Sequence, residues 1–486
     1  MTPGDGAPLA RAGPVLRGIG LLLHVPAVMA LLSLPVCLIG DDGRGWQALA
    51  VTAGVAVAAG QGLYWLCRGA PETRRHHAML IAALAWLALS AVGALPFLLA
   101  GSDIAPLDAL FESLSAHTGT GLSVLAPQEL PHLLQWWRSL AQWIGGVGVI
   151  VLLLAVLPPN RGSLELYYSE GREQKIRPNV TGTVRAIWSL YLGYTAAAVG
   201  LLWLAGEPAW RALNHAMTAI ATGGMTITGD SLASATDIAK LAYLPILIAG
   251  ATSFAVHYRV WREGRVASGL FGGLEQRLGW GILLLGVPLI VFQNHWADAD
   301  IPVVDSALQW ISAATTAGFQ SADLGEWPLI SVLWLLPVMT IGAMAGSTGG
   351  GIKLARLAML YRALLWSIRT IVRRPHEVLR FVYDGEVLAR ADAAARVRAA
   401  TVLSIGWGLL LFCGILALAQ AAPGWTLEQI IFEAASAQNN VGLTSGVTGP
   451  DAPAGAKIVL MLLMWMGRLE IVPAMVLLAL LLNRGK

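Results

Sequence analysis

Long apolar stretches alternate with short polar connections along the chain. Examples of the apolar stretches are residues 51–66, 78–100, 143–157, 242–256, 281–292, 402–418 and 458–482. A helix needs about 20 mostly apolar residues to cross a bilayer, and several stretches reach that length with their flanks. The pattern therefore predicts an all-α membrane protein.

Ten membrane spans are expected from this pattern. They cover residues 15–38, 46–67, 78–100, 136–158, 186–205, 240–262, 278–293, 328–365, 399–420 and 457–482. The connections after the second, fourth, sixth and eighth spans each carry three or more Lys and Arg, whereas the opposite connections carry few. Because basic connections stay in the cytoplasm, we expect both termini to be cytoplasmic and the first span to remain in the mature protein.

The composition excludes a soluble globular protein. Of the 486 residues, 56% are hydrophobic and 13% are charged, and the mean hydropathy is +0.64. Soluble domains are about 25% charged. The net charge of +3 gives no reason to expect a nucleic-acid partner. Cys37, Cys67 and Cys413 show no metal or redox spacing, so we expect them to serve as small apolar side chains.

Four of the outer connections share one sequence pattern. They read DALFESLSAHTGTGLSV, RALNHAMTAIATGGMTI, DSALQWISAATTAGFQS and QIIFEAASAQNNVGLTS, and they align on Gly121, Gly224, Gly318 and Gly442. Six positions before the glycine lies a hydroxyl residue, and five before lies an alanine. Nine positions before it lies a polar residue, which is Glu112, His215, Gln309 or Glu433. Four copies on one side of the membrane indicate a repeat architecture.

The repeated glycine has a physical explanation. A chain that lines a narrow pore presents successive carbonyls inward, which requires positive φ angles that glycine adopts at little cost. Rings of carbonyls replace the hydration shell of a cation, and the C-terminal end of a helix dipole attracts a cation. We therefore expect four pseudo-symmetric helix–pore loop–helix units around one pore. The expected division is an N-terminal transmembrane hairpin at 1–77 and pore units at 78–185, 186–277, 278–398 and 399–486.

The eighth span is interrupted by the segment IGAMAGSTGGGIKLAR. Its glycines disfavour a lipid-facing helix, since each costs about 1 kcal/mol relative to alanine. We interpret the segment as a flexible gate under the filter, with close helix packing as the alternative. A phosphate-binding loop is excluded because Ile352 follows the last glycine, where that motif requires Lys and then Ser or Thr.

The last span carries two charged residues, Arg468 and Glu470. Arg468 lies near the centre of the apolar run, where a charge normally faces a pore or a partner. It suits a barrier to cation flow, or a group that holds the glycine segment by its carbonyls. Glu470 is expected to pair with another helix, and a structural Arg–Glu pair between helices is the alternative. His117 and His215 are expected to pack or to form hydrogen bonds.

Taken together, these motifs resemble the TrkH type of the Trk/Ktr/HKT superfamily of potassium transporters. The resemblance covers essentially the whole chain and rests on DALFESLSAHTGTG, HAMTAIATGGMT, TTAGF, AQNNVGLT, AGSTGGGIK and MGRLE. It implies potassium uptake across the bacterial inner membrane, with no enzymatic activity and no cofactor besides the transported K+.

The resemblance also implies the site residues. The potassium filter is expected at Thr118, Gly119, Thr120, Gly121, Thr222, Gly223, Gly224, Thr316, Ala317, Gly318, Asn440, Val441 and Gly442. The ligands of K+ are expected to be the carbonyls of Thr120, Gly121, Gly223, Gly224, Ala317, Gly318, Val441 and Gly442. The gate is expected at Ala345, Gly346, Ser347, Thr348, Gly349, Gly350, Gly351 and Lys353. Arg468 is expected to be the pore arginine.

The implied partners are a second copy of the chain and a cytosolic TrkA-type ring that binds nucleotides. Residues 161–177 and 369–380 are the expected docking segments. A sodium-permeable, or sodium- or proton-coupled, transporter of the same fold is the alternative function. An integral membrane enzyme would need a nucleophile and base at membrane depth, which the sequence does not show. A non-conducting sensor would be indicated by lost filter glycines, and all four are present.

Overall fold

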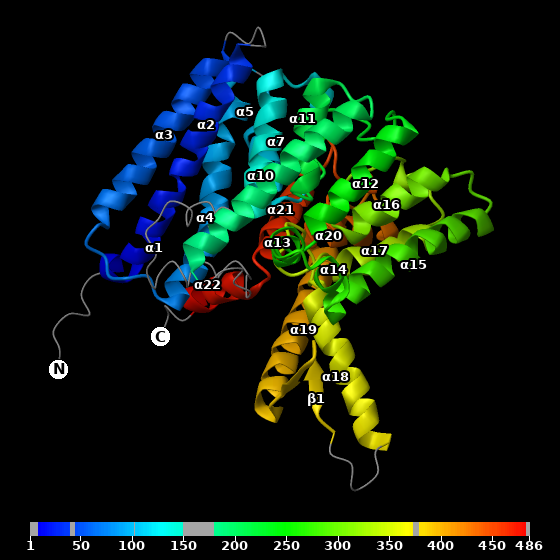
Figure 1. The fold of residues 1–486 in the computed structure, drawn as a ribbon. Helices are drawn as coiled ribbons and strands as arrows, with labels where there is room; N and C mark the ends of the chain where they lie inside the picture. The colour runs from blue at the N-terminus through cyan, green and yellow to red at the C-terminus, as the bar shows by residue number, and fades with distance from the viewer. Residues whose placement is uncertain (1–7, 39–43, 102, 149–178, 373–378, 483–486) are drawn as a thin grey trace, which may run out of the picture.

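The computed structural model describes residues 8–38, 44–101, 103–148, 179–372 and 379–482 and is mainly helical (Figure 1). Its elements are α1 (Pro8–Leu22), α2 (His24–Cys37), α3 (Gly45–Leu66), α4 (Arg75–Gly93), α5 (Leu95–Leu99), α6 (Pro106–Thr118), η1 (Pro127–Glu129), α7 (His132–Val147), α10 (Val180–Leu204), α11 (Ala209–Ile220), α12 (Asp237–Ala251), α13 (Phe254–Glu263), α14 (Val266–Phe271), α15 (Leu274–Trp296), α16 (Val303–Ala314), η2 (Leu324–Glu326), α17 (Leu329–Ile341), α18 (Leu354–Val372), β1 (Phe381–Tyr383), β2 (Glu386–Leu388), α19 (Arg390–Ala421), α20 (Leu427–Gln438), α21 (Ala454–Arg468) and α22 (Val472–Leu482).

The N-terminal helices α1, α2 and α3 pack together at one edge of the molecule, shown in blue in Figure 1. Gly20 and Gly60 let α1 and α3 approach closely, because a Cβ on either glycine would lie under 3.0 Å from the carbonyl oxygen of the other. This layer packs against the rest of the molecule through α4 and α7.

Four sets of helices repeat one packing scheme. Each set, here called a unit, has an outer, a short and an inner helix: α4, α6 and α7; α10, α11 and α12; α15, α16 and α17; and α19, α20 and α21. In every unit the short helix packs on both the outer and the inner helix. Each inner helix also packs on the short helix of the next unit, through α7–α11, α12–α16, α17–α20 and α21–α6. The fourth unit therefore closes on the first.

Within the described residues, six helical segments are long and apolar enough to cross a membrane, and up to eight if two bent helix pairs count as spans. The six segments are Ala12–Cys37, Gly45–Leu66, Arg75–Leu99, Val180–Leu204, Leu274–Trp296 and Arg390–Ala421. They correspond to six of the ten expected spans. Of the fourth, only the part up to residue 148 is described. The eighth is interrupted between α17 and α18, as its glycines predict.

The sixth and tenth expected spans are each divided into two helices that meet at a sharp bend. α12 and α13 meet at 99°, and α21 and α22 meet at 109°. At the first bend, the Ser253 side chain accepts a hydrogen bond from the Ala255 N–H and caps α13. At the second, Glu470 and Ile471 have φ of 52° and 68°. Both bends contain polar residues, Thr252 and Ser253 at the first and Arg468 and Glu470 at the second, but the apolar runs on either side dominate an averaged hydropathy.

The helices α18 and α19 extend beyond the other helices and are joined by a short β-hairpin (Figure 1). Strands β1 and β2 pair antiparallel, with Tyr383 opposite Glu386. Asp384 and Gly385 form the turn with φ of 48° and 83°, a conformation that an Asp-Gly pair adopts readily. Both helices run further than the sequence pattern predicts, and the hairpin was not predicted.

Candidate functional site

The short helices α6, α11, α16 and α20 end in the same backbone motif. The left-handed residues that follow them are Gly119, Thr222, Thr316 and Asn440, with φ of 72°, 51°, 55° and 51°. In each case the N–H of the left-handed residue donates to the carbonyl three residues earlier. The N–H of the residue after it donates to the carbonyl five residues before that residue, and all these distances are 2.8–3.2 Å. These two bonds define the Schellman motif. One local geometry is thus repeated four times, and Gly119 adopts it with the least strain.

The glycines Gly121, Gly224, Gly318 and Gly442, here called the ring glycines, follow two residues later with φ of 95°, 74°, 75° and 96°. A Cβ built on each would lie under 3.0 Å from a carbonyl oxygen of the next unit in the cycle or, in the fourth unit, of the first. The carbonyls met by the four ring glycines, in chain order, are those of Gly223, Ala317, Val441 and Thr120. We call these the ring carbonyls. The four segments close into a ring that leaves no room for a side chain at any ring glycine.

The polar residue nine positions before each ring glycine fixes the chain beyond the ring. Its side chain accepts a hydrogen bond from the backbone N–H three positions after the ring glycine in all four units. The donor–acceptor distances are 2.7, 3.1, 3.3 and 2.9 Å for Glu112, His215, Gln309 and Glu433. All four side chains are buried. The sequence reveals this column of residues but not its role.

Both histidines of the short helices form hydrogen bonds, which confirms that expectation. A ring nitrogen of His117 lies 2.7 Å from the Ser113 carbonyl oxygen. His215 Nδ1 lies 2.7 Å from the Tyr243 hydroxyl, in addition to the backbone contact described above.

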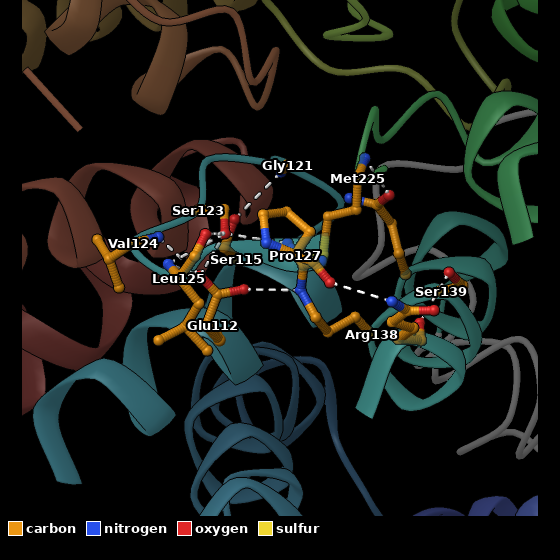
Figure 2. A network of polar contacts seen from close by, with 12 residues as sticks. Glu112, Ser115, Gly121, Ser123, Val124, Leu125, Pro127, Arg138, Ser139 and Met225 are labelled. Atoms are coloured by element: carbon orange, nitrogen blue, oxygen red, sulfur yellow. Dashed lines mark hydrogen bonds and ion pairs between the residues drawn. The ribbon is translucent and has the colours of Figure 1, made fainter. Parts of the chain in front are cut away.

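Arg138 of α7 connects the first two units (Figure 2). Its Nε lies 2.9 Å from Oε2 of Glu112, and its Nη2 donates to the Ser123 hydroxyl at 3.0 Å. Its Nη1 donates to the Thr226 carbonyl in the second unit at 3.0 Å. The side chains of Arg138 and Glu112 are 1% and 0% exposed. No role for Arg138 is predicted from the sequence. The available signal was the single charge within the fourth expected span.

The glycine-rich loop, residues 342–353, lies against the ends of the short helices. The Thr348 hydroxyl donates to the carbonyls of Ile220 and Gly250 at 3.0 and 2.9 Å, and it accepts from the Thr222 hydroxyl at 3.1 Å. The loop therefore contacts the end of the second short helix through a side chain that can both donate and accept.

Backbone groups of the same loop contact the third and fourth units. The Gly350 N–H donates to the Thr316 hydroxyl at 2.7 Å, and the Gly351 N–H donates to the Asn439 carbonyl at 3.1 Å. A Cβ on Gly350 would lie under 3.0 Å from the Asn439 carbonyl oxygen. Close approach to the helix ends thus requires glycine here.

The remaining expected gate residues contact other helices or other residues of the loop itself. The Ala345 N–H donates to Glu275 at 2.6 Å, and the Gly346 carbonyl accepts from the Phe254 N–H at 3.1 Å. The hydroxyl of Ser347 and the ammonium of Lys353 donate to carbonyls within the loop, those of Met344 and Gly349 respectively. Gly349 packs against Ala343 and Thr316. The loop is therefore anchored by these contacts as well.

Arg468 lies at the C-terminal end of α21, beside the bend, and not in the middle of a continuous helix as the apolar run suggests. Its guanidinium donates to the carbonyl of Gly145, and to those of Gly146 and Thr348 at 3.4 and 3.5 Å. Its charged end also lies 5.2 Å from the centroid of the Trp86 ring. Arg468 thus connects the end of α7 with the glycine-rich loop through their carbonyls.

Two neighbours of Arg468 explain its placement. A Cβ on Gly119 would lie 3.7 Å from the Arg468 guanidinium, an ordinary van der Waals distance, so Arg468 lies beside the end of the first short helix. Glu470 forms an ion pair with Arg356 of α18. This confirms the prediction that Glu470 pairs with another helix.

The arrangement can hold a dehydrated cation. Four helix C-termini, which carry partial negative charge, converge on a ring of backbone carbonyls, the ligand type found in cation filters. A cavity below the ring is lined by Trp86, Asn440, Arg468 and residues of the glycine-rich loop. The described residues contain no group of His, Cys, Asp and Glu that could bind a metal. Around the ring, backbone carbonyl oxygens of each segment lie close to the ring glycine of the preceding one.

Two expected docking segments are only partly visible. Residues 161–177 lie outside the described residues, as do 373–378 of the segment 369–380. Residues 369–372 form the end of α18 in the protruding part of the molecule.

The sequence matches the family model TrkH, described as cation transport protein, over residues 46–285 and 288–486. It is 35% identical over 409 residues to an uncharacterized cation transporter of Methanocaldococcus jannaschii, which covers 83% of this chain and 82% of that protein. It is 31% identical to the Trk system potassium uptake protein TrkH of Halomonas elongata and 30% identical to that of Escherichia coli K12. Both matches cover 95% of this chain and 97% of the relative.

The fold is also similar to a solved structure. The crystal structure of the potassium transporter TrkH from Vibrio parahaemolyticus superimposes with a TM-score of 0.83 at 28% sequence identity. The superposition covers 96% of this chain and 98% of that chain. The likeness thus extends over the whole of the four-unit arrangement and the N-terminal helices.

Proposed function

The chain belongs to the TrkH family of cation transport proteins, and on that premise we propose that it takes up potassium across the bacterial plasma membrane. The observation that carries the proposal is the closed ring made by Gly121, Gly224, Gly318 and Gly442 and the four ring carbonyls. The names of the relatives, Trk system potassium uptake protein, support potassium as the ion. The membrane potential would drive the ion inward, since 100 mV supplies about 2.3 kcal/mol per charge.

The filter of this proposal consists of backbone carbonyls. The ligands of K+ would be those of Thr120, Gly121, Gly223, Gly224, Ala317, Gly318, Val441 and Gly442. The fourfold Schellman motif supports this assignment, because it directs four chains with one geometry toward a common ring. The side chains of Thr118 and Thr120 share a hydrogen bond of 2.8 Å and stiffen the first of these chains.

The glycine-rich loop would be the gate. It lies under the ring and contacts the second, third and fourth units directly, while Arg468 connects it with the first. A chain crossing the pathway at this depth would block it, so the described conformation would be a closed state. Arg468 adds a positive charge that repels cations below the filter. Opening would require the loop to exchange its bonds to Thr222 and Thr316 for other partners.

Thr348→Val is expected to raise cation uptake by at least about tenfold, because the contacts of its hydroxyl with Ile220, Gly250 and Thr222 no longer hold the closed loop and a hydrogen bond contributes roughly 1 kcal/mol. The measurement is the initial rate of 86Rb+ uptake into proteoliposomes. Thr340→Val is the matched control, since its hydroxyl donates only to Leu336 within its own helix. A rate for Thr348→Val at or below that of the wild type would contradict the gate assignment.

The proposed assembly is a homodimer with a cytosolic nucleotide-binding ring of the TrkA type, with both termini in the cytoplasm. The basic connections support this orientation. The protruding helices carry Arg369 on α18 and Arg390 and Arg396 on α19, which suits a docking surface for an acidic partner. The relatives are named as proteins of a Trk system, and this name supports an assembly with further protein components.

The proposed function is tested by rubidium uptake into proteoliposomes that contain the purified chain, with sodium as competitor. We expect uptake that potassium inhibits and that a tenfold excess of sodium lowers by no more than about half, as roughly a tenfold or larger preference requires. Equal inhibition by sodium would assign the sodium-permeable alternative. An absence of uptake, with and without the cytosolic partner, would overturn the proposal.

A further inference from the structure

Gln142 of α7 is a buried amide at a position where two of the other three inner helices carry apolar side chains. Three inner helices carry a glycine at the same place, namely Gly145, Gly250 and Gly467. A Cβ on each of these glycines would lie under 3.0 Å from the carbonyl oxygen of the residue four positions before a ring glycine. Three positions before these glycines lie Gln142, Leu247 and Met464, each 0% exposed. The fourfold pattern therefore does not require the amide, and its role belongs to the first and second units alone.

The amide holds the second ring segment at two points. Its Nε2 donates to the Gly223 carbonyl at 2.8 Å, and its Oε1 accepts from the Met225 N–H at 2.9 Å. These two groups flank Gly224, a ring glycine. Gln142 thus binds the chain before and after Gly224 from behind the ring, with both polar atoms satisfied.

Gln142 also explains why the second ring segment has a glycine before its ring glycine. The other three segments have Thr120, Ala317 and Val441 there, all buried. A Cβ on Gly223 would lie under 3.0 Å from the Cδ, Cγ and Nε2 atoms of Gln142. The Gln142 side chain occupies the space that a side chain at position 223 would need, so the two residues are coupled.

The Gly223 carbonyl differs from the other proposed ligands. Among the eight carbonyls, that of Gly223 is the only one that accepts a hydrogen bond from a residue described in the structure. A carbonyl that already accepts a hydrogen bond is less free to turn toward an ion and offers it a weaker field. Both effects disfavour small ions, which need short contacts and strong ligands.

We infer that Gln142 is a specificity-determining residue, which restrains the Gly223 carbonyl and thereby disfavours sodium relative to potassium. The inference rests on the proposed function. It assigns the selectivity of the ring partly to a side chain outside the ring, on the inner helix of the neighbouring unit.

The test is Gln142→Met, which keeps the side-chain length and introduces the residue found at position 464. We expect the ratio of rubidium to sodium uptake in proteoliposomes to fall about tenfold, as the loss of one or two hydrogen bonds allows. The matched control is Gln135→Met on the same helix, whose amide bonds Pro127 and Trp210 and not the ring. The control is expected to keep the wild-type ratio.

A second variant guards against a folding defect in Gln142→Met. Gln142→Ala combined with Gly223→Ala removes the amide and gives the second segment the residue that the third has at Ala317. Gly223 has no positive φ, so alanine is compatible with its backbone. We expect this variant to have the same lowered ratio, with the protein eluting as a single species from gel filtration.

The outcomes separate this inference from the proposed function. A wild-type ratio in both variants, while Gly318→Ser alters it, would overturn the role of Gln142 and leave the filter in place. A ratio near one in the wild type and in all variants would overturn the proposed function itself. A lowered ratio in Gln135→Met as well would show that the effect is not specific to the ring.

Discussion

Gly318→Ser is expected to abolish the preference for rubidium over sodium, with a fall of at least about tenfold in the uptake ratio, equivalent to about 1.4 kcal/mol. The φ of Gly318 is 75°, which strains any other residue by about 1–3 kcal/mol. A Cβ there would lie under 3.0 Å from the Val441 carbonyl oxygen, so the fourth segment must move. Because each ring glycine contacts the next segment, the displacement widens the whole ring and does not shift one ligand alone.

This prediction is checked by uptake of 86Rb+ and 22Na+ into proteoliposomes. Gly408→Ser is the control, because Gly408 of α19 is exposed, has no positive φ and has no neighbour within 4 Å of its Cβ position. It is expected to match the wild type. An unchanged ratio in Gly318→Ser would show that the four glycines do not form the filter.

Arg138→Met is expected to destabilise the protein by about 3–5 kcal/mol, because it leaves the buried carboxylate of Glu112 without its countercharge. It also removes the donors to Ser123 and to the Thr226 carbonyl, and with them a connection between the first two units. The measurement is the thermal unfolding temperature of the purified protein in detergent.

The control for this prediction is Arg265→Met, since the Arg265–Glu263 pair is 69% and 39% exposed. Exposed pairs contribute about 0–1 kcal/mol, so little change is expected. Adding Glu112→Gln to Arg138→Met is expected to recover part of the lost stability, because the unpaired charge is then gone. If Arg138→Met unfolded at the temperature of the control, the network would have no structural role.

The ring was predictable from the sequence because its pattern occurs four times. Gly121, Gly224, Gly318 and Gly442 stand in the same context in four outer connections, and a constraint on the backbone is the common explanation. The structure adds what the pattern could not contain. The positive φ falls at two positions per segment, and at the first of them Thr222, Thr316 and Asn440 adopt it without being glycine.

The bends and the inter-unit contacts were not predictable in the same way. The charges of Arg468 and Glu470 mark the second bend, but a charge within an apolar run also occurs in continuous helices that face a pore or a partner, so it does not reveal a bend. The contacts of Arg138 and Gln142 depend on which helices are neighbours, and single sequence positions carry no such information. The hairpin at Asp384 and Gly385 did have a local signal, the Asp-Gly pair.

The proposed filter is tested most directly by anomalous scattering from crystals grown with Tl+, a heavy substitute for K+. We expect a peak on the axis of the ring, bounded by the carbonyls of Thr120, Gly223, Ala317 and Val441. Excess K+ is expected to remove the peak, and excess Na+ is expected to leave it. A ring without anomalous density, or a peak only at other positions, would contradict the central claim that these four segments form the cation filter.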